Sequence, residues 1–167
     1  MELRLVGSEM CIRDSKIGDD CAYLSQTKQL ISSDTLVENI HFDLKYFTPK
    51  NIAHRLFTAN YSDIQSSGGK PKYVLLNLSF PNKNFRFVNK IIKNFHRYCL
   101  KYGIEIIGGD TTASDKIFLS LTIISDAINK NKIIKRSQAK INDKIYTFSG
   151  IGSVSYTHLR AHETQFH

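Results

Sequence analysis

Residues 104–112 of the chain read Ile-Glu-Ile-Ile-Gly-Gly-Asp-Thr-Thr, and the predicted fold is built outward from this stretch. Its apolar start is typical of a buried strand, which passes directly into two glycines, a carboxylate and two hydroxyls. Glycines permit a sharp turn close to a ligand, and an aspartate can hold a hard cation such as Mg²⁺ through oxygen. By itself the stretch favours a simpler interpretation, a turn in which Asp110 caps the residues that follow. The neighbouring segments decide between the two.

The segments on either side predict helices and further strands. Residues 85–102 have apolar side chains at helical spacing, and Gly103 ends this helix. Thr48 caps a second helix, which Pro49 begins and which extends to residue 67. Strands are expected at residues 21–24, 30–37, 73–80, 104–107, 117–128, 133–134 and 144–148. This order predicts an α+β fold in which helices pack on one face of a mixed β-sheet.

Length and composition are those of a single globular domain. The chain has 167 residues, of which 41% are hydrophobic, and this is enough for a sizeable core. No apolar run approaches the roughly 20 residues that span a bilayer, and no charged-then-apolar leader is visible, so we expect a cytoplasmic protein without a membrane partner. Three cysteines without paired spacing argue against a disulfide framework or a zinc site.

The positive charge does not predict a nucleic-acid partner. The net charge is +8, but the 23 Lys and Arg residues are scattered along the chain. The aromatic side chains mostly occupy predicted core positions and do not alternate with basic ones, as they would on a stacking surface. We interpret the basic side chains of residues 85–102 as the solvated face of a helix.

Four aspartates stand at predicted strand ends or at the border of a helix: Asp20, Asp34, Asp63 and Asp110. Each has an ordinary explanation as a turn or surface residue. Gathered at one edge of a sheet, however, four carboxylates need divalent cations, and Mg²⁺ held by carboxylates and substrate phosphates is typical of phosphoryl transfer. The sequence has no Walker-type or kinase-type glycine loop, so the metals would take over that role.

The two ends of the chain differ from its middle. Residues 6–15 and 153–164 resemble peptides that arise when sequencing-adapter DNA is translated within an assembled reading frame. We therefore predict that residues 1–15 and 153–167 are artefactual tails. Residues 16–152 would then be an amino-terminal ATP/Mg-binding domain of a truncated enzyme.

Five ordered motifs carry a resemblance to a known family. They are residues 17–20 (Ile-Gly-Asp-Asp), 32–37 (Ser-Ser-Asp-Thr-Leu-Val) with His41-Phe42, 60–63 (Asn-Tyr-Ser-Asp), 108–112 (Gly-Gly-Asp-Thr-Thr) and 136–143 (Arg-Ser-x-Ala-Lys-x-x-Asp). In order and spacing they resemble the thiamine-monophosphate kinases, within the superfamily of aminoimidazole ribonucleotide synthetase. The resemblance covers residues 16–152 and implies the amino-terminal ATP-binding domain of that superfamily's fold.

The resemblance implies ATP-dependent phosphorylation of thiamine monophosphate to thiamine diphosphate. The transfer would be direct and in line, without a protein nucleophile. Several Mg²⁺ ions would assist it, because metals can gather charge from two phosphorylated substrates. The metal ligands that the resemblance implies are Asp20, Ser32, Ser33, Asp34, Asp63 and Asp110, with Asp19 as a second choice.

The resemblance also implies the contacts with both substrates. Gly109 and Asp110 would contact ATP, and Arg136 would clamp one of its phosphates. His41 would contact the thiamine phosphate. Family members form homodimers by joining their sheets through this domain, which an exposed sheet edge at residues 73–80 would permit.

A carboxy-terminal half supplies a further metal motif and much of the thiamine pocket in the family, so we expect this chain alone to lack kinase activity. Two other functions stay open. One is another enzyme of the superfamily that uses ATP and Mg²⁺ on a different small substrate. The other is a basic nucleic-acid-binding module, which salt-dependent retention on DNA or RNA that survives Asp34→Asn and Asp110→Asn would support.

Overall fold

The computed structural model describes residues 19–129 and 133–144. The predicted tails, and all but the first residue of the strand predicted at 144–148, lie outside the described residues. The elements are β1 (Ala22–Leu24), β2 (Gln29–Val37), α2 (Pro49–Ser66), β3 (Gly69–Phe80), the 3-10 helix η1 (Asn82–Asn84), α3 (Phe85–Tyr102), β4 (Glu105–Gly108), β5 (Thr111–Ala113), β6 (Phe118–Ala127) and η2 (Arg136–Gln138).

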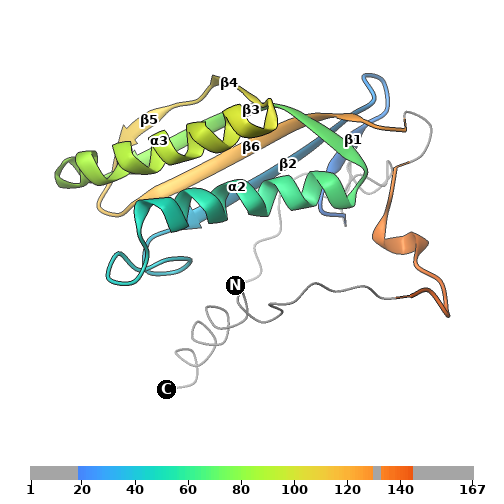
Figure 1. Ribbon diagram of the computed structural model, residues 1–167, viewed down its shortest axis with the longest axis horizontal. Helices are drawn as coiled ribbons and strands as arrows, with labels where there is room; N and C mark the ends of the chain where they lie inside the picture. The colour runs from blue at the N-terminus through green and yellow to red at the C-terminus, as the bar shows by residue number, and fades with distance from the viewer. Residues whose placement is uncertain (1–18, 130–132, 145–167) are drawn as a thin grey trace, which may run out of the picture.

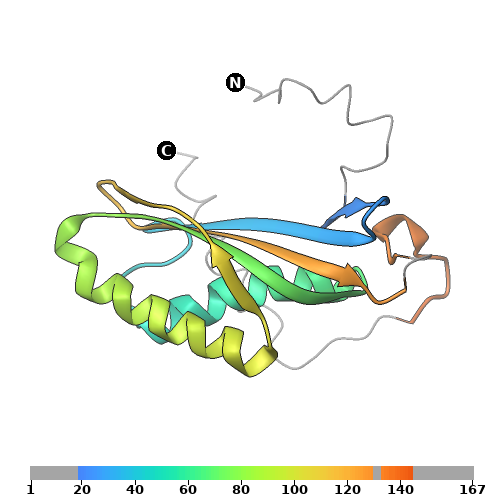
Figure 2. The same cartoon turned by 90° about the horizontal axis from the view of Figure 1, so that it is seen from above.

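One mixed sheet contains all the described strands. Its order is β1-β2-β6-β3-β4, and β5 also pairs with β3. Antiparallel pairing joins β1, β2, β6 and β3, whereas β4 and β5 run parallel to β3. Both α-helices pack on the same face of the sheet (Figures 1 and 2). The predicted α+β fold, with helices on one face of a mixed sheet, is therefore confirmed.

Local signals set the ends of both helices. Thr48 Oγ1 accepts the backbone N–H of Asn51 at 3.2 Å, and Pro49 stands in the first turn of α2. Gly103, with φ of 65°, ends α3 in the left-handed conformation. The observed bounds agree with the predicted helices to within one residue. Among the described residues, no helix is long and apolar enough to cross a bilayer.

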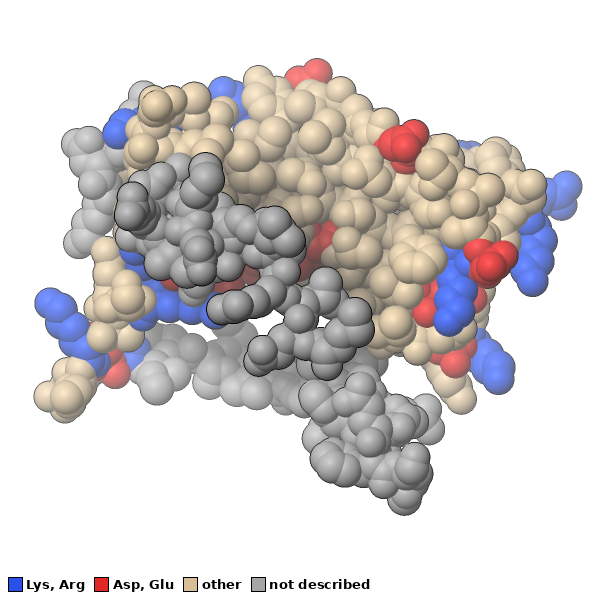
Figure 3. Space-filling model, turned by 180° about the vertical axis from the view of Figure 1, so that it is seen from behind, with Lys and Arg blue, Asp and Glu red and all other residues tan. Residues whose placement is uncertain are grey.

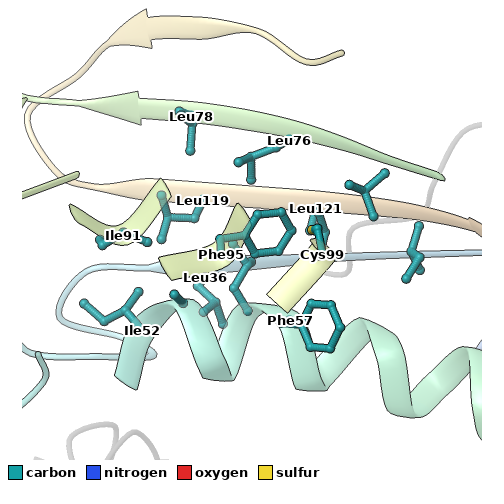
Figure 4. Close-up of a cluster of buried hydrophobic side chains, with 14 of the residues drawn as sticks. Leu36, Ile52, Phe57, Leu76, Leu78, Ile91, Phe95, Cys99, Leu119 and Leu121 are labelled. Carbon is teal, nitrogen blue, oxygen red and sulfur yellow. The ribbon is translucent and has the colours of Figure 1, made fainter. Parts of the chain in front are cut away.

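The hydrophobic core lies between the helices and the sheet (Figure 4). Alternate side chains of each strand point toward the helices, because successive residues of a strand face opposite sides. Ile52 and Phe95 from the helices and Leu119 and Leu121 from β6 are fully buried there. Their burial, at about 25 cal/mol per Å² of apolar surface, holds the helices against the sheet.

No described helix covers the other face of the sheet, which we call the open face (Figure 2). Hydroxyl groups pair across its strands, Ser33 Oγ with Thr122 Oγ1 and Thr35 Oγ1 with Ser120 Oγ, each at 2.9 Å. Figure 3 views the molecule from this side. The part of the open face that β2 and β6 form is therefore lined by paired hydroxyl groups.

Three predictions about strand placement are wrong. The strand in residues 104–107 is not buried, because β4 lies at the edge of the sheet and Ile107 is 48% exposed. Residues 73–80 do not form an exposed edge, because β3 lies between β6 and the pair β4 and β5. Residues 133–134 form no strand, and the Ile134 N–H donates to the Ser67 carbonyl instead. Apolar runs predict that a strand exists, but its neighbours in the sheet depend on pairing between distant segments.

Candidate functional site

Four of the predicted metal ligands, Ser32 and three aspartates, lie where the end of α2 approaches β1 and β2. Ser32 is buried on the helix-covered face of β2, and its Oγ donates to Asp63 Oδ2 at 3.1 Å. Asp34 lies two residues further along β2 and therefore on the same face. Asp20 precedes β1, and its charge and that of Asp34 both act on Asp63. We call Asp20, Asp34 and Asp63 the acidic cluster.

The electrostatics of the acidic cluster favour a bound cation. Burial raises the pKa of the Asp63 carboxyl, and the charges of Asp34 and Asp20 raise it further. The Ser32 hydrogen bond and the Arg136 charge lower it, but the net shift is upward. Neighbouring carboxylates disfavour one another's charged forms. A cation bound at the cluster would remove this repulsion.

Arg136 and Asp19 lie beside the acidic cluster. The Arg136 guanidinium forms an ion pair with Asp20, and the Arg136 backbone N–H donates to Asp19 Oδ1 at 2.9 Å. The Arg136 side chain is 68% exposed, so this pair contributes little stability, on the order of 0–1 kcal/mol. An exposed guanidinium at this place can exchange its carboxylate partner for a phosphate at small cost.

The oxygen donors in this part of the molecule fit Mg²⁺. Asn60, one helical turn before Asp63, is fully buried, and its Oδ1 has no hydrogen-bond partner among the described residues. A buried acceptor without a partner is costly unless water or a cation satisfies it. The described residues include no group of three His, Cys, Asp or Glu side chains placed to hold a metal by themselves. Mg²⁺ commonly completes its coordination with water and substrate phosphates, which this arrangement would require.

The Gly-Gly-Asp turn, residues 108–110, joins β4 to β5 at the other edge of the sheet. Gly109 has φ of 149°, and a Cβ there would lie 1.8 Å from the Leu76 carbonyl oxygen. Only glycine fits this close approach to β3. The Asp110 N–H donates to Asn77 Oδ1 at 2.9 Å, and Asp110 Oδ1 accepts the Thr111 N–H at 2.8 Å. The backbone shape of the turn and the Asn77 side chain together set the position of this carboxylate.

A pocket of about 300 Å³ lies beside this turn. Polar groups of the open face form much of its wall, and Thr112 Oγ1 donates to Ser79 Oγ at 3.0 Å within it. The lining residues are Asn77, Leu78, Ser79, Asp110, Thr112, Phe118 and Ser120. Hydroxyls, an amide and one carboxylate suit a small ligand rich in hydrogen-bonding groups.

The acidic cluster and the Gly-Gly-Asp turn do not meet within one chain. Asp34 belongs to the helix-covered face. Asn77, whose side chain binds Asp110, belongs to the open face. Its neighbours Leu76 and Leu78 are buried and point into the core, so the Asn77 side chain points the other way. β6 and β3 separate β2 from β5. At about 4.8 Å per strand spacing, the Cα atoms of Asp34 and Asp110 are about 14 Å apart. With Mg–O distances of about 2 Å, one ion cannot bind both carboxylates.

Two other predicted site residues lie apart from the acidic cluster. Ser33 is on the open face, where it pairs with Thr122. His41 follows β2, and its Nδ1 accepts the Val37 N–H at 3.0 Å, so the neutral ring carries its proton on Nε2. Arg55 Nη1 donates to the His41 carbonyl at 2.6 Å. The bond from Val37 orients the His41 ring, and the bond from Arg55 holds the His41 backbone.

Sequence patterns assign no function to Asn60 or Asn77. The helical spacing of α2 places Asn60 at its buried edge, but an unpaired oxygen there depends on the neighbouring elements. The alternation of β3 puts Asn77 opposite Leu76 and Leu78, which could have been predicted. Its bond to Asp110 depends on the pairing of β3 with β5, which no local pattern reveals.

Known proteins resemble this chain over most of its length. The family model described as AIR synthase related protein, N-terminal domain, matches residues 18–126. The thiamine-monophosphate kinase of Haemophilus influenzae is 39% identical over 140 residues, which cover 81% of this chain and 42% of that protein. The thiamine-monophosphate kinase of Bacillus subtilis is 34% identical over 145 residues, which cover 84% of this chain and 44% of that protein. The chain therefore spans less than half the length of these curated relatives.

The fold also matches a solved structure. AaThiL complexed with AMPPCP and TMP superposes with a TM-score of 0.69 at 27% identity, over 84% of this chain and 48% of that one. The similarity in sequence and the similarity in fold thus concern the same class of proteins.

Proposed function

We propose a function from the premise that this chain belongs to the AIR synthase related protein family, whose N-terminal domain it contains. The proposed activity of the complete protein is ATP-dependent phosphorylation of thiamine monophosphate to thiamine diphosphate. Relatives named thiamine-monophosphate kinase, and a solved relative complexed with AMPPCP and TMP, support this activity. The structural observation that carries it is the acidic cluster, since transfer between two phosphorylated substrates needs oxygen ligands for Mg²⁺.

Bound Mg²⁺ would supply neutralisation of phosphate charge. We propose that Asp20, Asp34, Asp63 and Asp110 hold several such ions, assisted by Ser32 and Ser33, and that no single ion binds both Asp34 and Asp110. The bond from Ser32 to Asp63 supports this assignment, because it orients one carboxylate of the cluster. In-line transfer requires no protein nucleophile, so the chain's own contribution is positioning and electrostatics.

The proposed substrate contacts are on different elements. Arg136 clamps a phosphate of ATP, for which its exposure and weak pairing with Asp20 are suitable. Gly109 and Asp110 contact the nucleotide beside the pocket on the open face. His41 contacts the thiamine phosphate, and its fixed ring orientation supports a positioning role.

A homodimer joined through the sheets of this domain belongs to the same proposal, as does a cytoplasmic location. The hydroxyl pairs on the open face support the dimer, because these uncharged side chains can meet a second copy without burying unpaired charges. We also propose that this chain is inactive by itself, since it covers 42% of the Haemophilus influenzae enzyme.

The alternative function of the complete protein is that of a related enzyme with a different small phosphate acceptor, because the groups for Mg²⁺ and ATP do not specify the acceptor.

The test is a kinase assay on the complete protein that carries this domain, with ATP, Mg²⁺ and thiamine monophosphate. Thiamine diphosphate should form, and Asp63→Asn should lower kcat/KM by about 100-fold or more. The matched control is Asp126→Asn, because Asp126 is an exposed aspartate paired with Lys72 and should leave kcat/KM within about twofold. Phosphorylation of another acceptor would establish the alternative, and no phosphorylation of either kind would contradict both.

A further inference from the structure

We propose that Asn77 is a positioning residue for Asp110, a role that rests on the proposed function of Asp110 as a ligand contact. Asn77 lies in the second half of β3, outside every motif that links the chain to its family. Its Oδ1 accepts the Asp110 N–H at 2.9 Å, and both residues line the same pocket.

The bond replaces a backbone bond that the sheet cannot make at this place. β3 pairs with β4 through residues 73–75 and with β5 through residues 78–80, so the parallel ladder is interrupted between them. Gly109 passes directly against the Leu76 carbonyl in this gap. Beyond the gap the Leu78 N–H donates to the Asp110 carbonyl at 2.8 Å, while the Asp110 N–H turns to the Asn77 side chain.

Three hydrogen bonds therefore orient Asp110. Leu78 holds its carbonyl, Asn77 holds its N–H, and the Thr111 N–H binds its Oδ1. The last bond leaves Oδ2 as the carboxylate oxygen for a ligand. Of the three partners, only Asn77 acts through its side chain, so this bond can be removed by substitution without changing the backbone of the sheet.

The bond also sets the orientation of the Asn77 amide. Because Oδ1 accepts the Asp110 N–H, the Nδ2 group of Asn77 points away from that N–H and keeps two donors for other acceptors. An alanine at this position would lose the acceptor and both donors. An aspartate would keep the acceptor, lose both donors and add a negative charge near Asp110.

The first measurement is hydrogen exchange of backbone amides in this chain. Asn77→Ala should accelerate exchange of the Asp110 N–H by about fivefold or more, because the N–H loses its acceptor. Asn77→Asp, which keeps an acceptor, should restore slow exchange. Asn94→Ala is the matched control, because the Asn94 amide also makes a hydrogen bond to backbone, at 2.7 Å to the Lys90 carbonyl on α3. It should leave the Asp110 N–H unchanged.

The second measurement is steady-state kinetics of the complete protein. Asn77→Ala should raise KM for ATP roughly tenfold with little change in KM for the phosphate acceptor, because the nucleotide contact is displaced. Asn94→Ala should change neither value.

The two measurements separate the possible failures. Unchanged exchange of the Asp110 N–H in Asn77→Ala overturns the positioning role. Faster exchange with an unchanged KM for ATP also overturns the proposal, because Asp110 would then be positioned without consequence for the nucleotide. Faster exchange in Asn77→Ala, together with a complete wild-type protein that does not use ATP, refutes the proposed function and leaves the structural role of Asn77 intact.

Discussion

The acidic cluster and the Gly-Gly-Asp turn both present carboxylates, but they are built in different ways. Side chains from three segments form the cluster, and its members disfavour one another's charge. Backbone forms the turn, where Gly109 lies against β3 and the Asp110 N–H binds Asn77. The cluster is on the helix-covered face, and the turn contacts the open face.

This difference shows what each region depends on. The cluster depends on charge, and a cation would stabilise it. The turn depends on shape, because a single added carbon atom would collide with β3. Substitutions that change volume should therefore disturb the turn, and those that change charge should disturb the cluster.

Gly109→Ala should have the largest effect on stability. The new Cβ would lie 1.8 Å from the Leu76 carbonyl oxygen, so the backbone must move, and we expect a loss of about 2–4 kcal/mol in the free energy of unfolding. Gly103→Ala is the control: its φ is also positive, at 65°, but no atom lies within 4 Å of the new Cβ. It should cost about 1–2 kcal/mol in urea unfolding. Equal losses in the two variants would show that close approach to β3 is unimportant.

Mg²⁺ should stabilise the chain through the acidic cluster. At a concentration about 100 times its Kd, a ligand of the folded state adds about 2.7 kcal/mol to the free energy of unfolding. Asp34→Asn and Asp63→Asn should remove most of this gain in thermal unfolding with and without Mg²⁺. Asp110→Asn should keep it, since Asp110 lies at the other edge of the sheet. Equal loss in all three variants would contradict the separation of the two regions.

The pH dependence of stability should reveal the repulsion within the cluster. Burial, Asp34 and Asp20 raise the pKa of Asp63 in the folded state above its ordinary value of 3.8. The folded state therefore binds the proton more tightly than the unfolded state, and this contribution to stability is full below pH 3.8 and lost as pH rises through the raised pKa. Without metal, stability should fall less over this window in Asp63→Asn than in the wild type. Identical pH profiles from chemical unfolding would contradict the predicted repulsion.

Ser32→Ala should have the smallest effect of the four. It removes the hydrogen bond to Asp63 and should cost about 1 kcal/mol in the free energy of unfolding. Ser33→Ala, the neighbouring residue on the open face, removes an exposed hydroxyl pair with Thr122 and should cost about 0.5 kcal/mol or less. A larger loss for Ser33→Ala than for Ser32→Ala would mean that the helix-covered face is not the more sensitive one.

The helices and the residue types of the site could be predicted from sequence. Thr48, Pro49 and Gly103 act locally, so their signals survive without knowledge of the fold. The aspartates stood out because charge at strand ends and helix borders is costly without a partner. Their grouping could not be predicted, because it depends on which strands pair. The sequence pattern suggested one site with four aspartates, whereas the structure holds Asp110 apart from the other three within one chain.

The sequence by itself determined the helices, most of the strands, the α+β class and the motifs that mark the family. Those properties follow from periodicity and from chemistry within a few residues. Only the tertiary structure decided that β3 is central, that β4 is an edge strand and that Asn77 supports Asp110. The physical reason is that strand pairing joins segments distant in sequence, and the face on which a side chain lies becomes meaningful only when its neighbours are known.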